Sequence, residues 1–161
     1  MIIADMQERI SELESQPASN SQLYPIWINP LLKAQAHFDQ QVAARYAVLP
    51  AIQPQSKTLH RLSLDVARLL LLYETRTFRS LAVYIVEMDD HTFGQLDRQI
   101  LQGFADLAGQ WPQHTDELVR LKRKCDFIRP RLLQYDLGWV PGSAALYLGQ
   151  IAEGLNRLDV Q

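Results

Sequence analysis

The sequence of 161 residues contains a single cysteine, Cys125. One thiol cannot form a disulfide within the chain, and a chain without disulfides is typical of a reducing compartment. The N-terminal stretch has no basic flank and soon becomes acidic, unlike a secretory signal. We therefore expect a cytoplasmic protein that folds without disulfide bonds.

Long apolar runs and a strong excess of one charge are also missing. The uninterrupted apolar runs, such as Leu69 to Tyr73, are far shorter than the roughly 20 residues that a membrane-spanning helix requires. The formal net charge is −2, so nothing global indicates a polyanion partner. Hydrophobic residues make up 47% of the chain, which excludes global disorder. We expect a soluble protein with no membrane partner.

Motifs of common catalytic and cofactor sites are absent from the sequence. The seven glycines are scattered and form neither a phosphate-binding loop nor a dinucleotide fingerprint. Ser143 lacks the glycine pattern of a nucleophile elbow, and Cys125 shares the apolar side of its predicted helix. The acidic and histidine cluster at 87–91 matches no known metal spacing and suits a charged interhelix connection. We expect no catalytic residue, no metal and no cofactor.

The stretch from Leu59 to Met88 is rich in apolar residues at helical spacing. In its first half, one apolar face contains Leu59, Leu62, Val66, Leu69, Leu70 and Tyr73. A second apolar face contains Leu64, Ala67 and Leu71. A polar stripe with Arg61, Asp65 and Arg68 runs between them. A helix that is apolar on two sides is typically surrounded by other helices, so 59–88 is predicted to be central. It forms one long helix, or two nearly in line with a break near Thr75.

Five further segments have helical periodicity and are bounded by start and stop signals. The predicted starts are Asn29 with Pro30 behind it, Thr92, Thr115 and Ser143. Pro130 predicts a kink or a short break at about 126–129 in the fifth helix. No strand pair is indicated. The sequence therefore predicts a single all-α domain over 1–161, a bundle of about six helices around the central helix 59–88.

Residues 1–15 form a short predicted amphipathic helix on a polar linker, 16–25. Its apolar residues are Ile3, Met6, Ile10 and Leu13, at spacings of three and four. A helix of this length is only marginally stable alone and must dock on something. It either packs on its own bundle or acts as an arm that docks on another subunit.

A dense run of cations is the strongest local anomaly of the sequence. Six cations fall within twelve residues, opposed only by Asp126: Arg120, Lys122, Arg123, Lys124, Arg129 and Arg131. Apolar residues of the same segment take the inner side, so we expect the cations on the outer side. Such a face can be a solvated surface, a dock for an acidic protein or a site that neutralises phosphates.

Two tryptophans beside prolines, Trp27 and Trp139, are candidate interface anchors, although such residues more often cover the ends of a core.

Together these patterns favour a non-catalytic helical interaction protein: an adaptor, a regulatory or chaperone-like subunit, or a self-associating module. The alternative is a nucleic-acid-binding protein that uses Arg120–Arg131. The second alternative, a cofactor-binding or enzymatic bundle, requires polar groups that converge in a cavity.

Overall fold

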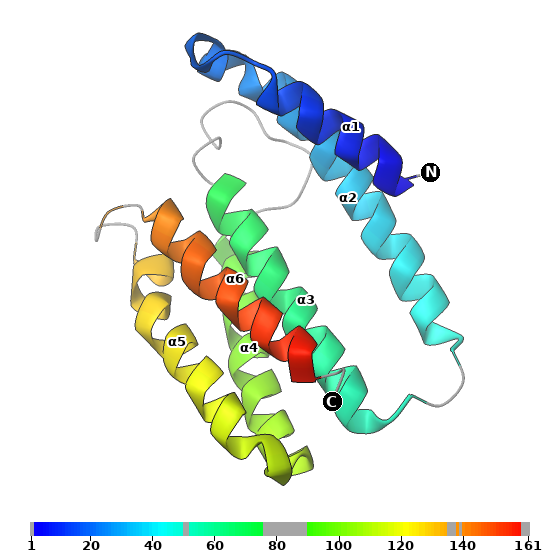
Figure 1. Cartoon of the computed structure of the whole chain (residues 1–161), viewed down its shortest axis with the longest axis vertical. Helices are drawn as coiled ribbons and strands as arrows, with labels where there is room; N and C mark the ends of the chain where they lie inside the picture. Colours follow the sequence, from blue (N-terminus) through cyan, green and yellow to red (C-terminus); the bar gives the residue numbers. More distant parts are fainter. Residues whose placement is uncertain (1, 50–51, 76–89, 135–137, 139, 159–161) are drawn as a thin grey trace. The chain divides into compact units, whose positions relative to one another are not determined.

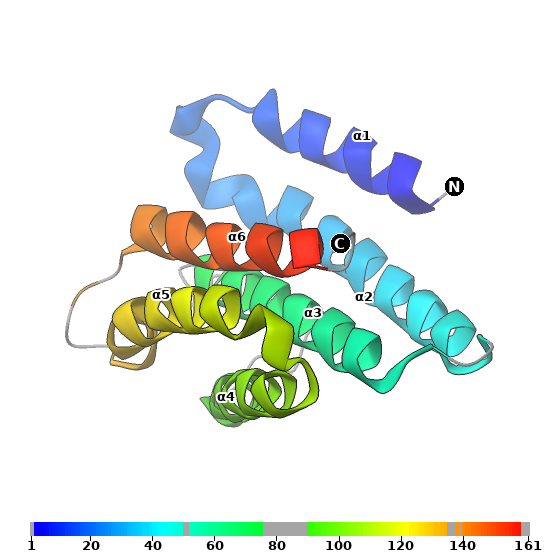
Figure 2. The same cartoon turned by 60° about the horizontal axis from the view of Figure 1, so that its bottom comes forward.

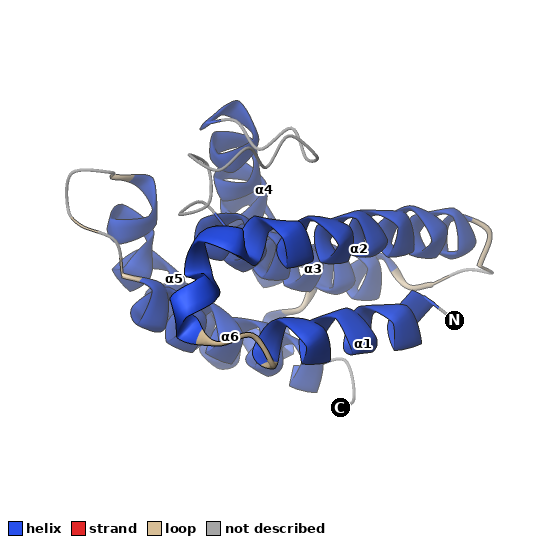
Figure 3. Ribbon diagram, turned by 90° about the horizontal axis from the view of Figure 1, so that it is seen from above, coloured by secondary structure: helices blue, strands red, loops and turns tan. Residues whose placement is uncertain are grey.

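The computed structural model describes residues 2–49, 52–75, 90–134, 138 and 140–158. These residues form six α-helices and two short 3-10 helices and contain no strand (Figures 1 and 3). The predicted all-α helical class is confirmed. The described helices fall into two compact units, α1 with α2 and α3 with α4, α5 and α6. The organisation of 1–161 as a single domain stays a prediction.

The first unit is a pair of helices, α1 (Ile2–Glu14) and α2 (Tyr24–Ala47), with the 3-10 helix η1 (Ala18–Leu23) between them. α1 packs against α2 of the same chain. Only part of its predicted apolar set is covered, because Met6 and Leu13 are half-buried whereas Ile3 and Ile10 are 56% and 40% exposed.

The start of α2 differs from the prediction. The helix begins at Tyr24, so Asn29 and Pro30 lie inside it, and η1 occupies much of the predicted linker 16–25. Ile28 and Leu32 are buried and lie four residues apart, so the apolar helical phase already exists before Pro30. Proline fits helical backbone angles and removes one hydrogen bond, and the helix continues through it.

The second unit contains α3 (Pro54–Thr75), α4 (Asp90–Gln110), α5 (Thr115–Leu133) and α6 (Pro141–Leu158), with the 3-10 helix η3 (Pro112–His114) before α5. α3 packs against both α4 and α6, and α5 packs against α6 and α4 (Figure 2). Neighbouring helices are antiparallel, because residue numbers rise along one helix as they fall along the other. The contacts that show this are Thr58–Gln110 and Leu62–Gly103 for α3 and α4, Ser63–Asn156 and Tyr73–Val140 for α3 and the start of α6, and Leu121–Gly154 and Lys124–Gln150 for α5 and α6. The unit is therefore an up-down-up-down four-helix arrangement.

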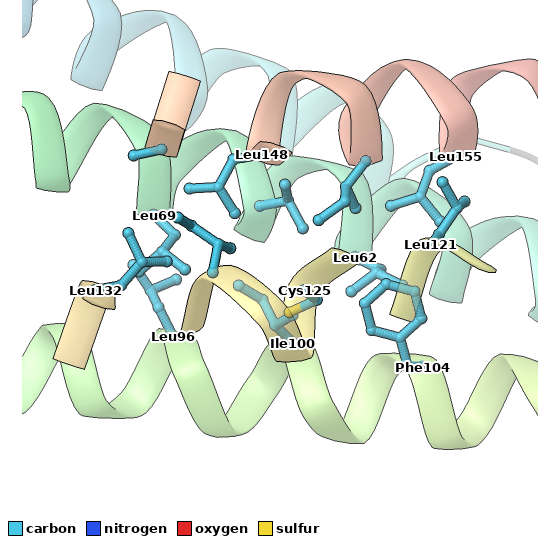
Figure 4. Packing of buried hydrophobic residues seen from close by; sticks show 14 of the residues in the cluster. Leu62, Leu69, Leu96, Ile100, Phe104, Leu121, Cys125, Leu132, Leu148 and Leu155 are labelled. Carbon is cyan, nitrogen blue, oxygen red and sulfur yellow. The ribbon is translucent and has the colours of Figure 1, made fainter. Parts of the chain in front are cut away.

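Apolar side chains from all four helices of this unit form one buried cluster (Figure 4). The first predicted face of α3 lies in it: Leu59, Leu62, Val66 and Leu69 are at most 3% exposed. The second predicted face is not enclosed. Leu64 is 39% exposed, Ala67 is exposed and Leu71 is half-buried, because α4 and α6 both contact the other side of the helix. α3 is described as far as Thr75, so the predicted break near Thr75 and the rest of the predicted central helix, 76–88, lie at the edge of or outside the described residues.

Helices of this unit begin earlier than predicted, so the predicted caps lie in their first turns: Thr92 in α4, Thr115 in α5 and Ser143 in α6. α6 starts at Pro141, where the missing N–H costs no intrahelical bond. Of the kink or short break predicted at 126–129 in α5, the break is wrong, because the helix is continuous through Pro130, and the kink stays a prediction. That proline lies in the last turn, and it costs the one hydrogen bond that its own N–H would have donated to the carbonyl of Asp126.

Candidate functional site

The six cations of Arg120–Arg131 do not share one side of α5. Helical spacing places Arg120, Arg123, Lys124 and Arg131 on the same side as Phe127, at seven, four and three residues before it and four after it. Lys122 and Arg129 lie on a different side, towards α4. The predicted basic surface is thus divided into two groups with different surroundings.

The second group is engaged in ion pairs. Arg129 donates two hydrogen bonds to Asp97 of α4, at 2.6 Å from Nε to Oδ1 and 2.8 Å from Nη2 to Oδ2. The bond to Asp97 raises the pKa of Arg129 further above its ordinary value. Lys122 Nζ lies 2.7 Å and 2.9 Å from the carboxylate oxygens of Asp126. These two cations are matched by carboxylates of their own chain, and Arg129 ties α5 to α4.

The first group surrounds an exposed aromatic residue. Phe127 is 65% exposed, and its ring centroid lies 4.9 Å from that of Tyr147 on α6 at an interplanar angle of 48°. Single exposed apolar residues are common on protein surfaces, whereas neighbouring ones indicate a contact surface, so the contact with Tyr147 is what distinguishes Phe127. We call this surface the α5–α6 face and define it by Arg120, Arg123, Lys124, Phe127 and Arg131 of α5 with Tyr147 and Gln150 of α6.

Positive charge on the α5–α6 face is only partly neutralised. Arg120 pairs with Glu117, whose pKa is lowered mainly by that hydrogen bond. Lys124 Nζ donates to the neutral amide of Gln150 at 2.8 Å. Among the described residues, no carboxylate lies within ion-pair distance of Arg123 or Lys124. The two cations nearest in sequence before Phe127 therefore remain available to an anionic group.

Other candidates from the sequence lie elsewhere. Trp27 is half-buried in α2, in the first unit, and Trp139 lies outside the described residues. The cluster at 87–91 also lies outside them, apart from the backbone at the start of α4. In the described part of the chain, no three His, Cys, Asp or Glu side chains gather as a metal site would require.

Cys125 is a core residue. Its side chain is 4% exposed and lies inside the apolar cluster (Figure 4). Burial raises the pKa of the thiol to about 11, so the thiolate is scarce at neutral pH. A nucleophilic role for Cys125 has no support in this environment, as its position on the apolar side of the helix indicated.

A groove of about 400 Å³ between α3 and α4 contains the buried carboxylate of Asp65, which the sequence placed in a polar stripe and not among the candidate site residues. Asp65 is 3% exposed, and its carboxylate pairs with Arg68 at 3.7 Å and Arg61 at 4.0 Å. A signal for its burial exists in the sequence. Asp65 follows Leu62 by three residues and precedes Leu69 by four, so it shares the buried side of the helix.

Replacing Asp65 with Asn tests the cost of this burial. Desolvation raises the pKa of the Asp65 carboxyl above its ordinary value of 3.8, and the charges of Arg68 and Arg61 oppose the rise. A group with a raised pKa in the folded state favours folding below its unfolded-state pKa and loses this contribution as pH rises. We therefore expect the unfolding free energy of the wild type, minus that of Asp65→Asn, to fall as the pH rises above about 4. Urea unfolding at several pH values measures it, and a difference that grows with pH would contradict the assignment.

None of the described helices combines the length and the apolar composition needed to cross a membrane. Comparisons with protein-family models, curated proteins and solved structures give no match. A functional proposal for this chain therefore depends on its own side chains and their surroundings.

Proposed function

We propose that the protein is a non-catalytic helical interaction protein whose α5–α6 face binds an acidic segment of a partner protein. The observation that carries the proposal is Phe127, 65% exposed beside Tyr147, with Arg123 and Lys124 one helical turn before it. Aromatic and arginine side chains dominate the binding energy of protein interfaces. An acidic segment with an apolar anchor would complement both features of the face.

Nucleic acid is the second candidate, since cations next to an exposed aromatic residue also suit phosphates and bases. Two observations favour the protein partner. Lys122 and Arg129 are already matched by Asp126 and Asp97, which shortens the row of cations that could follow a phosphate backbone. Phe127 and Tyr147 pack on each other at an angle, so they do not form a series of separate stacking platforms.

Selection of binding peptides from a random displayed library tests the proposal. We expect the selected peptides to be rich in Asp and Glu and to carry an aromatic or aliphatic anchor. Phe127→Ala and Arg123→Gln should each weaken the best peptide at least about tenfold, a change of about 1.4 kcal/mol in binding free energy. Titration calorimetry or fluorescence anisotropy measures the affinities.

Matched controls are available elsewhere on the protein. Lys122→Gln removes the same charge as Arg123→Gln, but on the side of α5 that holds the Asp126 ion pair. Val42→Ala shortens an exposed apolar residue of α2. Both should leave the affinity unchanged. Peptides without acidic enrichment, equal losses in the controls, or tighter binding of a single-stranded oligonucleotide with a steep salt dependence would contradict the proposal.

A further inference from the structure

The residues that line the groove between α3 and α4 are not part of the α5–α6 face. Its α3 side carries Lys57, Arg61 and Asp65, which follow one another at intervals of four residues and so lie in one row. Its other polar residues belong to α4: Gln99, Gln102 and Asp106. Two cations and two carboxylates line the groove, so its charge is balanced overall.

Asp65 is the deeply buried member of this lining, at 3% exposure. Its ion-pair distances, 3.7 Å to Arg68 Nη1 and 4.0 Å to Arg61 Nε, both exceed the usual N–H···O range. Within the described ranges, the carboxylate has no hydrogen-bond donor. The charges of Arg61 and Arg68 compensate part of the lost hydration, and the Asp65 oxygens are not among the fully buried atoms that lack a partner. The carboxylate lines the groove, so the groove is the place from which a hydrogen-bond donor would come.

The charges of the groove limit the chemistry of a ligand. A simple cation would meet Asp65 but also the positive charges of Lys57 and Arg61. A simple anion would meet Arg61 but also Asp65 and Asp106. A compact zwitterion satisfies both signs at once, since it offers donors to the buried carboxylate and acceptors to the neighbouring guanidinium.

We infer that this groove binds a free α-amino acid, whose ammonium group donates to Asp65 and whose carboxylate accepts from Arg61. One carbon atom joins the two charged groups of such a ligand, and Arg61, whose Nε lies 4.0 Å from Asp65, has to turn away from Asp65 to admit it. The Arg61 side chain is 72% exposed and can adjust to the ligand, whereas Asp65 is held in place by its burial. The apolar Leu62 and the glycine at 103 also line the groove.

A panel of the common L-amino acids, each at about 10 mM, tests the inference by thermal unfolding and by titration of the ¹⁵N-labelled protein. We expect at least one of them to raise the unfolding temperature and to shift amide signals of α3 and α4. Its N-acetyl derivative, which lacks the ammonium group, and its decarboxylated amine should each bind at least about tenfold more weakly.

Variants distinguish binding in the groove from a non-specific effect of the dissolved amino acid on protein stability. Asp65→Asn keeps the side-chain shape, and Arg61→Gln changes a largely exposed residue, so both should fold, and each should weaken binding at least about tenfold. Arg98→Gln, at an exposed position of α4 outside the lining, should bind like the wild type. Absence of binding across the whole panel, equal binding of the amine alone, or unchanged affinity in Arg61→Gln would overturn the inference.

Discussion

Gly154→Ala is expected to lower the free energy of unfolding by about 1–2 kcal/mol. A Cβ atom at this position of α6 would lie 2.5 Å from Cδ2, 3.1 Å from Cδ1 and 3.3 Å from Cγ of Leu121 on α5. Leu121 is 2% exposed, so its side chain has little room to turn away. Overpacking of this kind costs about 1–3 kcal/mol, and the better helix propensity of alanine offsets up to about 1 kcal/mol.

Gly149→Ala is the matched control, because it makes the same change in the same helix. No atom outside its own helix neighbourhood lies within 4 Å of a Cβ built there. The alanine should therefore raise stability by up to about 1 kcal/mol through helix propensity alone. Urea denaturation of the two variants measures the contrast. Two alanines with the same effect would show that α5 and α6 do not approach closely at Gly154.

Asp97→Asn is expected to lower the free energy of unfolding by about 1–3 kcal/mol, because Arg129 loses its two charge-assisted hydrogen bonds. The Asp97 side chain is 11% exposed, so little water replaces the lost partner, whereas Arg129 is 37% exposed and recovers part of its hydration. The asparagine would keep one acceptor, its Oδ1, but its NH2 group would face a guanidinium that can only donate.

Asp126→Asn provides the comparison, since it removes the same charge from the ion pair with Lys122. Both side chains of that pair are more than 40% exposed, and exposed pairs within one helix contribute about 0.5 kcal/mol or less. Chemical denaturation at low and high salt measures both variants. An Asp97→Asn loss no larger than that of Asp126→Asn would refute a structural role for the α4–α5 bond.

Periodicity was sufficient to predict the helical class and the inner faces of the second unit. Leu62, Leu69 and Cys125 are buried as their spacing indicates, because each helix of this unit has an apolar side that must be covered. The residues at which the helices begin were harder to predict from the sequence. Thr92, Thr115 and Ser143 carry the side chains of caps, but the helices begin at Asp90, Thr115 and Pro141, and helix boundaries commonly differ by one or two residues.

The candidate sites depended on relations between helices, which a single sequence does not contain. The run at 120–131 indicated a basic surface, but only the position of Asp97 on α4 shows that Arg129 serves the fold. Phe127 gained importance from Tyr147 on another helix. Asp65 was assigned to a polar stripe, although its spacing to Leu62 and Leu69 already indicated burial. The basic run identified the right helix, and the packing of α5 on α4 and α6 decides which of its residues face a partner.

The most direct test of the proposed interaction surface is an amide-shift map of the ¹⁵N-labelled protein with the best acidic peptide from the displayed library. The α5–α6 face predicts that the perturbed signals gather around Arg123, Lys124 and Phe127 on α5 and Tyr147 and Gln150 on α6. Perturbations confined to α1 and α2, or to the groove between α3 and α4, would contradict the assignment of partner binding to this face.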